Sequence, residues 1–265
     1  CAIEKVKSLR EQSREIFQNV DFHFFYKGQC NYEFISKCLS NNTKRTINDI
    51  AEYPVNVGRN IGRKFVKTKF LIIADFEHQF SHGFERKITE LAKRYLSHGE
   101  RRILAYRIFE IDKNAKSPRD KKDLTELLKT KKAVAFHQKI YNVHSLPGLK
   151  KWLENSSGNG IFEPRLRMSR PNWEARFVST TAIPFHDEAF PYGIRDNTEL
   201  TYELCRANYT AALVDDLFVF HRGIKTKGGG KVRHINQRRF DKARRKFLTR
   251  LREQYPQTQK ICYKF

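Results

Sequence analysis

The chain has 265 residues, enough for one large domain or two small ones with a sizeable core. Its 52 Lys and Arg residues outnumber its 29 Asp and Glu residues, which gives a formal net charge of +23. A hydrophobic share of 39%, with 21 Phe and 11 Tyr, excludes a disordered basic protein because it supplies ample core-forming material. The charge favours a polyanionic partner, an anionic small ligand or an acidic surface.

No stretch approaches the roughly 18 apolar residues that span a bilayer, so we expect any signal or membrane anchor to lie outside this chain. The five cysteines form no CxxC pair, which argues against a zinc finger or a thioredoxin-like site. Three Asn-X-Ser/Thr sequons permit N-glycosylation in the secretory pathway, at Asn41, Asn155 and Asn208.

Hydrophobic periodicity predicts alternating helices and strands in the first half of the chain. In chain order these are a helix at 3–17, a strand at 21–26, a helix at 55–67, a strand at 70–74, a helix through 88–96 and a strand at 101–110. The continuous apolar run at 70–74 is typical of a strand that is buried on both faces. It ends at Asp75.

The second half continues this alternation. We expect a solvated excursion at 112–132, a strand at 177–183, a partly helical stretch at 186–208, a strand at 211–220, a flexible loop at 228–230 and a basic C-terminal helix. Such alternation indicates an α/β sheet that is largely parallel, with ligands beyond the carboxyl ends of its strands. Asp75 directly follows the predicted strand at 70–74, and His221 directly follows the predicted strand at 211–220.

Acidic side chains at Asp75 and Glu77 leave the sheet together, an arrangement suited to Mg²⁺ or Mn²⁺ and its bound phosphates. His221 ends a second strand, and the cations Arg222 and Lys225 after it complement phosphate charge. A strand that simply ends in charge, and a structural histidine, are the plainer alternatives at these two places.

Two acids, Asp187 and Glu188, lie in a turn between aromatic residues and are candidates for a general base. Asp196 and Glu199 are nearby alternatives. Acids before a helix also serve as N-terminal caps, which is the structural interpretation of the same residues.

Taken together, the segments resemble glycosyltransferase family 49, whose members act on the O-mannose glycans of dystroglycan. The resemblance covers roughly residues 50–256 and rests on several ordered motifs. They are Tyr53-Pro-Val-Asn56-Val-Gly-Arg59-Asn60, the strand ending in Asp75-Phe-Glu77, Ser81-x-Gly83, Trp173-Glu174, Pro184-Phe-His-Asp187-Glu188-x-Phe190-x-Tyr192-Gly193, Glu203-Leu204, Phe218-Val-Phe-His221-x-Gly223-x-Lys225, and Asn236-Gln237 through Tyr255-Pro256.

The resemblance implies a GT-A type single α/β domain over residues 1–265, with a mainly parallel central sheet flanked by helices. Residues 1–110 would form the nucleotide-sugar half, and residues 111–265 the acceptor half with the basic helix. It further implies an inverting, metal-dependent transfer of a sugar, with glucuronate suggested by the family, from a UDP-sugar to a glycan or glycoprotein acceptor. The location implied is the Golgi lumen, as a type II membrane protein in the full precursor, and the process is protein O-glycosylation.

Carried over residue by residue, Asp75 and Glu77 occupy the DxD positions, with Glu77 in place of the second Asp, and His221 completes the coordination of Mn²⁺ or Mg²⁺. Four residues are assigned to the donor: Arg59, Asn60, Arg222 and Lys225. The base is assigned to Glu188, Asp187 or, third, Asp196. His78 and Phe80 replace the family's usual apolar residue and Pro after the motif.

Two other classes stay open. One is a catalytically inactive carbohydrate-binding protein on the same fold. The other is a basic nucleic-acid-binding protein, which the charge favours. We expect no nucleic-acid partner, because Phe240, Phe247 and Leu251 share one stripe of the last helix and are predicted to face the core.

Overall fold

The structure is a computed structural model that describes residues 2–23, 46–140, 146, 148–155, 160–166, 168–170, 173–226 and 229–265. The chain forms two compact units, Cys1–Ile50 and Ala51–Phe265. The second unit contains all strands of the described residues, so the expected α/β domain corresponds to this unit. The expected boundary between two halves at residue 110 stays a prediction.

In the first unit, the apolar stripe predicted as one helix forms two helices. They are α1 (Ala2–Gln12) and α2 (Arg14–Asn19). Ser13 between them has an extended backbone, and its hydroxyl accepts the N–H of Ile16, so it starts α2 as an N-cap. The helix prediction is therefore confirmed with a break at Ser13.

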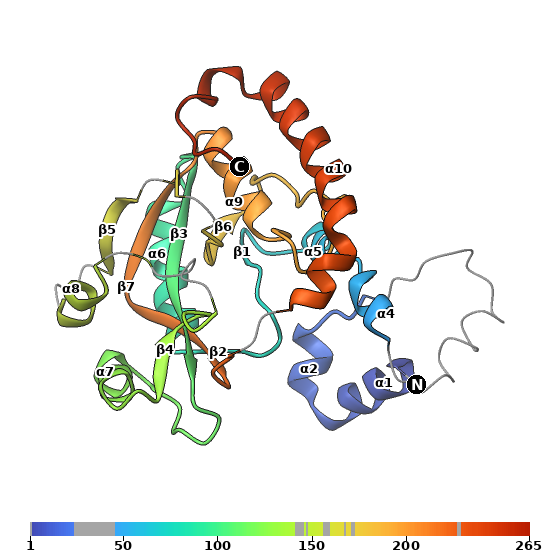
Figure 1. Ribbon diagram of the computed structural model, residues 1–265. Helices are drawn as coiled ribbons and strands as arrows, with labels where there is room; N and C mark the ends of the chain where they lie inside the picture. Colours follow the sequence, from blue (N-terminus) through green and yellow to red (C-terminus); the bar gives the residue numbers. More distant parts are fainter. Residues whose placement is uncertain are drawn as a thin grey trace. The chain divides into compact units, whose positions relative to one another are not determined.

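A seven-stranded sheet lies at the centre of the second unit, in the order β1-β6-β3-β7-β2, with β4 paired to β3 and β5 to β7. Its strands are β1 (Phe70–Ile72), β2 (His78–Phe80), β3 (Arg102–Ile111), β4 (Ala133–Ala135), β5 (Ile161–Leu166), β6 (Phe177–Thr180) and β7 (Thr210–Arg222). The long strands β3 and β7 run side by side at its centre (Figure 1).

The direction of the strands differs from the expected, mainly parallel, sheet. β3 and β7 form a parallel core, whereas the other pairs of the described strands are antiparallel. Helix–strand alternation forces a parallel pair only where a crossover joins neighbours in the sheet. Here neighbours in the sheet are mostly not neighbours in the chain, so the alternation could not determine their direction.

The helices that follow the first unit's α2 are short except for the last. They are α4 (Ile47–Ala51), α5 (Val55–Lys64), α6 (Phe84–Tyr95), α7 (Lys121–Lys129), α8 (Leu149–Glu154), α9 (Thr198–Arg206) and α10 (Gly230–Gln254), followed by a 3-10 turn at Pro256–Thr258. No helix of the described residues is long and apolar enough to cross a membrane.

Helices cover both faces of the sheet. Ile88 and Ala92 of α6 pack with Leu104 of β3 in one core cluster. Leu204 of α9 packs with Ile103 of the same strand in another cluster. Consecutive residues of a strand point to opposite faces, so these two clusters lie on opposite sides of β3.

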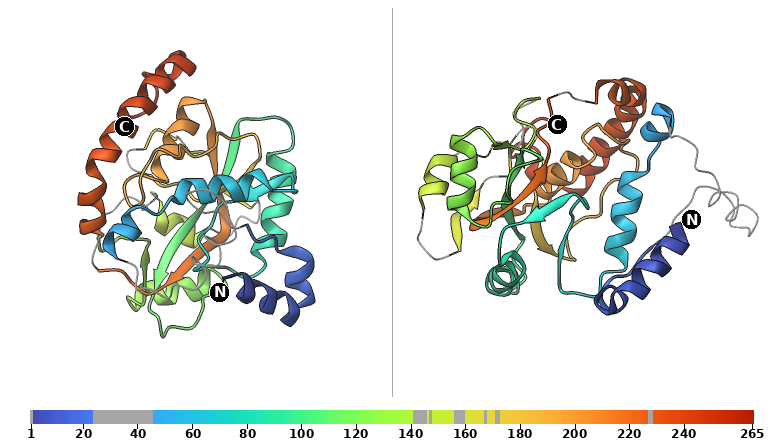
Figure 2. Two further views of the ribbon diagram at one scale, coloured as in Figure 1. Left: turned by 90° about the vertical axis from the view of Figure 1, so that its right-hand side faces the viewer. Right: turned by 90° about the horizontal axis from the view of Figure 1, so that it is seen from below.

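The basic C-terminal helix α10 runs along one edge of the second unit in the left view of Figure 2. Phe240, Phe247 and Leu251 on one of its stripes are buried, as predicted. Phe190 packs edge-on against Phe240 and Phe247. The aromatic residues of this helix thus belong to the core and are not a surface for stacking bases.

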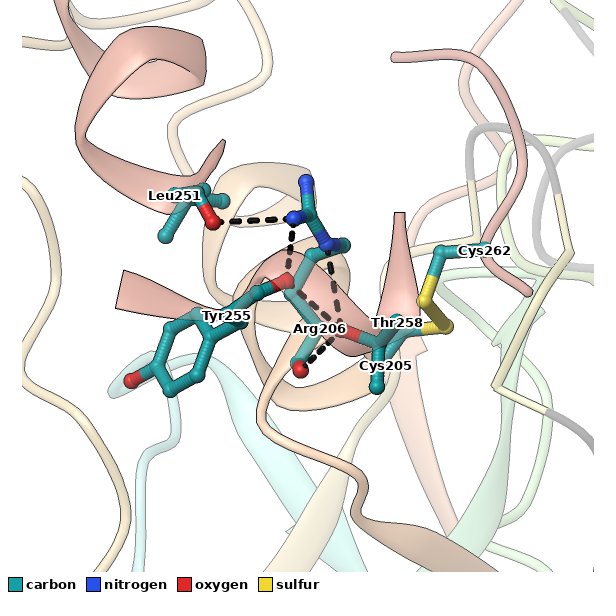
Figure 3. Close-up of a disulfide and its surroundings, with 6 residues drawn as sticks. All are labelled: Cys205, Arg206, Leu251, Tyr255, Thr258 and Cys262. Atoms are coloured by element: carbon teal, nitrogen blue, oxygen red, sulfur yellow. Dashed lines mark hydrogen bonds between the residues drawn. A yellow bond between two sulfur atoms is a disulfide. The ribbon is translucent and has the colours of Figure 1, made fainter. Parts of the chain in front are cut away.

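The end of α9 is joined to the C-terminal tail by a disulfide between Cys205 and Cys262 (Figure 3). The neighbouring Arg206 is buried and donates hydrogen bonds to the carbonyls of Leu251 and Tyr255, at 2.8 and 2.6 Å. These carbonyls lie at the end of α10, and each also accepts one backbone N–H, Leu251 O from Tyr255 and Tyr255 O from Thr258. Arg206 therefore caps α10 from another helix.

Four local predictions need correction. The strand predicted at 70–74 is the three-residue β1, and only Leu71 is buried, because β1 pairs with β6 alone among the described strands. The stretch at 112–132 contains α7, whose Leu124 is fully buried. Gly230 begins α10, so the predicted loop ends before it. Of the strand predicted at 21–26, the first three residues are not in a strand and the rest lie outside the described residues.

Candidate active site

Asp75 and Glu77 lie in the turn between β1 and β2. β2 runs antiparallel to β7 with His78 directly opposite His221. Because Glu77 precedes His78, this register brings its carboxylate to the imidazole, and Glu77 Oε2 lies 2.6 Å from His221 Nε2. The structure therefore brings together two of the three predicted metal-binding side chains, Glu77 and His221. The third, Asp75, lies two residues before Glu77 in the same turn.

Asp75 is surrounded by positive charge. Its Oδ2 lies 3.6 Å from Nη2 of Arg176, a buried residue immediately before β6. Burial would raise the pKa of Asp75, but the charges of Arg176, Arg59 and Lys225 together lower it. Asp75 is therefore an anion at neutral pH, held among cations from three separate segments.

His78 supports the Asp75 turn from beneath. Its side chain is buried, and its Nδ1 accepts the backbone N–H of Asp75 at 3.3 Å. Burial, with the charge of Arg176, lowers the pKa of His78 to about 4, so the ring is neutral. His78, in place of the apolar residue that the resemblance implies, is thus part of the support for the motif.

Two acids with raised pKa values lie near Asp75. Burial raises the pKa of Asp196, against the opposing charge of Arg59. Arg59 Nη1 donates to the Asp196 carbonyl at 2.8 Å and lies 3.3 Å from its Oδ2. Burial likewise raises the pKa of Glu174, which lies 3.9 Å from Arg176. A carboxyl group with a raised pKa is suited to proton transfer near neutral pH.

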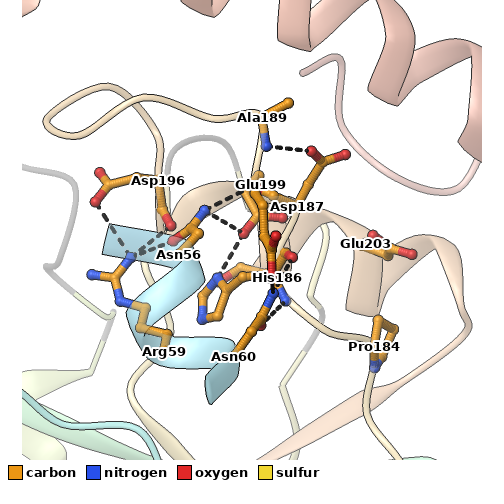
Figure 4. A network of polar contacts seen from close by, with 12 residues as sticks. Asn56, Arg59, Asn60, Pro184, His186, Asp187, Ala189, Asp196, Glu199 and Glu203 are labelled. Carbon is orange, nitrogen blue, oxygen red and sulfur yellow. Dashed lines mark hydrogen bonds and ion pairs between the residues drawn. The ribbon is translucent and has the colours of Figure 1, made fainter. Parts of the chain in front are cut away.

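The segment 184–188 is held to α5 by two asparagines (Figure 4). Asn60 accepts the N–H of His186 at 3.0 Å and donates to its carbonyl and to Glu188 Oε1, both at 2.9 Å. Asn56 donates to the carbonyl of Asp187 at 3.0 Å. In this structure Asn60, predicted to bind the donor, fixes this segment.

Below the same segment, His186 Nδ1 lies 2.6 Å from Glu199 Oε1, and both residues are buried. Burial raises the pKa of Glu199 well above its usual value and lowers that of His186. The pair is therefore joined by a proton on Glu199, with a neutral imidazole as acceptor. It serves as a structural support, since both groups are shielded from solvent.

A hollow of about 520 Å³ lies beside the segment 184–188. Asp187 and Glu188, the first two base candidates, line it together with Glu203 and Arg250. In Figure 4, Arg59 and Asp196 lie on one side of His186, and Pro184 and Glu203 lie on the other. The base candidates are thus divided between two sides of one segment.

The remaining predicted donor residues are Arg222, which ends β7, and Lys225, which follows it. Arg222 donates to the carbonyls of Lys113 and Ala115 and to the hydroxyl of Ser117, so it holds that loop. The backbone N–H of Lys225 donates to the buried carboxylate of Glu110 at 3.1 Å. Lys225 thereby keeps its ammonium in the electrostatic surroundings of Asp75.

Of the sequons, Asn208 is exposed in the turn before β7. Asn155 is half-buried, and its amide donates to Asp215 Oδ2 at 2.5 Å. Asn41 lies outside the described residues. Glycosylation at these sites stays a prediction, with Asn208 the most accessible of the two described ones.

The residues around the Asp75 motif fit a divalent cation. Two carboxylates and one imidazole are a suitable donor set for Mn²⁺ or Mg²⁺. His221 Nε2 already faces a carboxylate, while its buried Nδ1 has no hydrogen-bond partner. Within the described part of the chain, no three His, Cys, Asp or Glu side chains are close enough together to form a metal site as they stand.

Arg176 and Glu174 are site residues that sequence reasoning missed. The Trp173-Glu174 motif was visible, but its chemistry depends on Asp75, which is a hundred residues away in sequence and close only in the fold. A charged pair directly before a buried strand was the one local signal.

Residues 1–256 match the family described as "Glycosyl-transferase for dystroglycan". The beta-1,4-glucuronyltransferase 1 of Danio rerio is 25% identical over 216 residues, which cover 79% of this chain and 49% of the relative. The chain thus spans about half the length of this curated relative.

Among solved structures, the chain is similar to GalNAc-T7, crystallised with UDP, GalNAc and Mn²⁺. The sequence identity is 13% and the TM-score 0.44, over 76% of this chain and 41% of the other.

Proposed function

We propose, because this chain belongs to the glycosyl-transferase family for dystroglycan, that it transfers a sugar from a UDP-sugar to a glycan acceptor with inversion at the anomeric carbon. The expected family and its GT-A type α/β fold provide the premise. The observation that carries the proposal is the contact between Glu77 and His221 beside an ionised Asp75 that is surrounded by cations.

In this proposal Asp75, Glu77 and His221 hold a divalent cation. Such a cation would neutralise the donor diphosphate and stabilise the departing nucleoside diphosphate. Arg176 and Lys225, whose charges reach Asp75, would attract the same diphosphate. His78 would keep the turn in place without adding charge.

For the base we propose Asp196 ahead of Glu188 and Asp187, whereas the sequence placed Asp196 third. Asp196 shares Arg59 with the surroundings of Asp75, and its raised pKa suits the removal of a proton from an acceptor hydroxyl. Glu174 is the alternative on the same side. Asp187 and Glu188 line the hollow on the other side of the segment.

We further propose a compartment of the secretory pathway, with the Golgi as the family suggests. The Cys205–Cys262 disulfide supports this proposal, since disulfides persist in oxidising compartments and are rare in the cytosol. The sugar, with glucuronate as the family candidate, and the identity of the acceptor are part of the same proposal.

The test is a panel of UDP-sugars with Mn²⁺, assayed for hydrolysis and for transfer. We expect one donor to be consumed, and we expect Asp75→Asn and His221→Ala to reduce the rate by roughly 100-fold or more. Glu90→Gln, on the exposed side of α6, is the matched control and should leave the rate unchanged. Asp196→Asn should reduce transfer more than Glu188→Gln does.

The proposal fails if no donor is consumed. Metal-dependent binding of UDP without turnover would then favour the inactive carbohydrate-binding protein. Equal rates for wild type and Asp75→Asn would remove the motif from catalysis.

A further inference from the structure

The hollow beside the segment 184–188 has the lining of a sugar site. Its polar groups are carboxylates and their partners. Arg250 donates to both oxygens of Glu203 at 2.7 Å, and its Nη2 lies 3.5 Å from Asp187 Oδ2. Glu203 Oε1 also accepts the hydroxyl of Tyr255 at 3.5 Å, and Asp187 Oδ1 accepts the N–H of Ala189 at 3.0 Å. Glu203 Oε2 and Asp187 Oδ2, by contrast, each keep a further acceptor position. The hydroxyls of a sugar would supply the missing donors.

Donors are present at the same rim. Gln254 accepts an N–H of Arg250 through its Oε1 at 3.1 Å, so its amide NH₂ is directed away from Arg250. Glu188 is exposed, and only its Oε1 is held, by Asn60. The hollow therefore offers both acceptors and donors at fixed positions, as a polyol requires.

Phe185 supplies an apolar platform in this lining. Its side chain is 52% exposed, although it is a large hydrophobic residue. The guanidinium of buried Arg63 lies 4.3 Å from the ring centroid, and Arg63 is itself bonded to the carbonyls of Ile183 and Pro184. One face of the ring is thus fixed by a cation, while the other is left for the C–H face of a pyranose.

The charge of the hollow separates neutral ligands from acidic ones. Asp187, Glu188 and Glu203 carry three negative charges against the one positive charge of Arg250. The hollow is therefore net negative on a chain of net charge +23. Like charge disfavours a uronate, a phosphate or a sulfate here, whatever the rest of the surface attracts.

We propose that this hollow binds a neutral pyranose, as the subsite for a sugar unit of the acceptor other than the one attacked. Phe185 stacks on the ring, the carboxylates accept hydrogen bonds from the sugar hydroxyls, and Arg250 holds Glu203 and Asp187 in place. The assignment of this sugar to an acceptor rests on the proposed transferase function, whereas the binding of a neutral sugar does not.

The test uses saturation-transfer NMR on the full chain with methyl glycosides of glucose, galactose, mannose and xylose. Contacts with a single sugar are weak, so millimolar ligand is required, for a Kd of about 1 mM or above. We expect at least one glycoside to bind, and Phe185→Ala to weaken it by roughly five- to tenfold. Gln254→Ala should also weaken it. Ile261→Ala removes an apolar side chain with 65% exposure elsewhere and should change nothing.

Charge provides the second arm. Methyl glucuronide differs from methyl glucoside by its carboxylate. We expect the glucuronide to give no saturation-transfer NMR signal under the same conditions. Equal binding of the two would overturn the proposal. So would the absence of binding by all four neutral glycosides, or unchanged binding to Phe185→Ala.

The Asp75→Asn variant distinguishes this inference from the proposed function. It should bind the neutral glycoside like wild type while it turns over no donor. Glycoside binding without turnover by the wild-type chain would leave the sugar site standing and reject the transferase. Turnover without glycoside binding would support the transferase and reject the sugar site.

Discussion

At the end of α9, Arg206 performs the work of a helix cap for α10. Its guanidinium reaches two terminal carbonyls of α10, those of Leu251 and Tyr255, and the hydroxyl of Thr258. Leu251 O also accepts the N–H of Tyr255, and Tyr255 O accepts the N–H of Thr258, so Arg206 adds a charge-assisted donor to carbonyls that already have a partner. The joint between α9 and α10 therefore depends in part on Arg206, beside the Arg250–Glu203 ion pair.

Replacing this side chain tests that dependence. Arg206→Met keeps most of the volume and removes the charged donors, so we expect the free energy of unfolding to fall by about 2 kcal/mol. Denaturant unfolding measures it, and hydrogen exchange at the Tyr255 amide should accelerate. Arg245→Met, exposed on α10, is the control and should stay within about 0.5 kcal/mol of wild type. Equal stabilities would show that the backbone donors of Tyr255 and Thr258 are enough for these carbonyls.

Glu199 makes stability depend on pH. Burial raises its pKa well above the usual value, so the folded chain keeps a proton that the unfolded chain releases. A group with a raised folded pKa contributes its full stability below its unfolded pKa and loses it as the pH rises toward the folded pKa. Glu199→Gln resembles the protonated form and does not titrate.

We therefore expect the stability of Glu199→Gln relative to wild type to increase with pH, by up to about 1.4 kcal/mol per pH unit above the usual Glu pKa. Unfolding free energies at pH 5, 7 and 8 measure the difference. Burial lowers the pKa of His186, so both proteins lose stability in acid through this residue, and the effect cancels in the comparison. A difference that does not change with pH would contradict the shift.

At the scale of elements, the disulfide joins α9 to the tail that follows α10. It closes a loop with a sequence separation of 57. A cross-link over such a loop restricts the unfolded chain, and the loop-entropy relation gives about 4 kcal/mol.

We expect Cys262→Ala to lose about that much unfolding free energy, measured by urea denaturation. The Cys205→Ala, Cys262→Ala double variant is the control for a free thiol and should match the single one. A loss below about 1 kcal/mol would mean that the unfolded chain is already compact there.

Sequence patterns predicted the elements that local periodicity defines. β3 and β7 are near-continuous apolar runs and α10 carries an apolar stripe, and the structure has all three. The apolar run at 70–74 led to the wrong prediction of a strand buried on both faces. Composition indicates how apolar a strand is but not its place in the sheet, and Ile72 is 37% exposed in β1. The disulfide was not predictable either, since spacing alone does not pair cysteines.

The site was predictable in the same partial way. Asp75 and Glu77 could be recognised as two carboxylates after an apolar run, and His221 as the end of another. Arg176 carries no such local signal, because its meaning comes from a carboxylate brought to it by the sheet. Asn60 illustrates the converse: its motif position was noticed, but its partners lie at His186 and Glu188.

At the scale of the whole molecule, the four hydrophobic core clusters found among the described residues all lie in the second unit. The buried carbonyl of Ala51, at its start, accepts the side-chain amide of Asn236. This unit therefore has the core that independent folding requires.

We expect a fragment of residues 51–265 to unfold in one cooperative transition, with a Tm within about 5 °C of the full chain. Near-UV circular dichroism during heating measures it, with the disulfide intact in both proteins. A fragment without a cooperative transition would show that residues 1–50 complete its core.

The central pair of the sheet also bears on how the chain acquires its structure. Arg102 is paired with Thr210, so β7 can pair with β3 only after the whole segment between the two strands has been synthesised and has become compact. Closing so long a loop costs entropy before any pairing repays it, which makes folding slow. Until then the apolar strand β3 lacks its parallel partner at the centre of the sheet. We therefore expect a newly made chain to need chaperones, and its yield on expression to depend on them more than on its final stability.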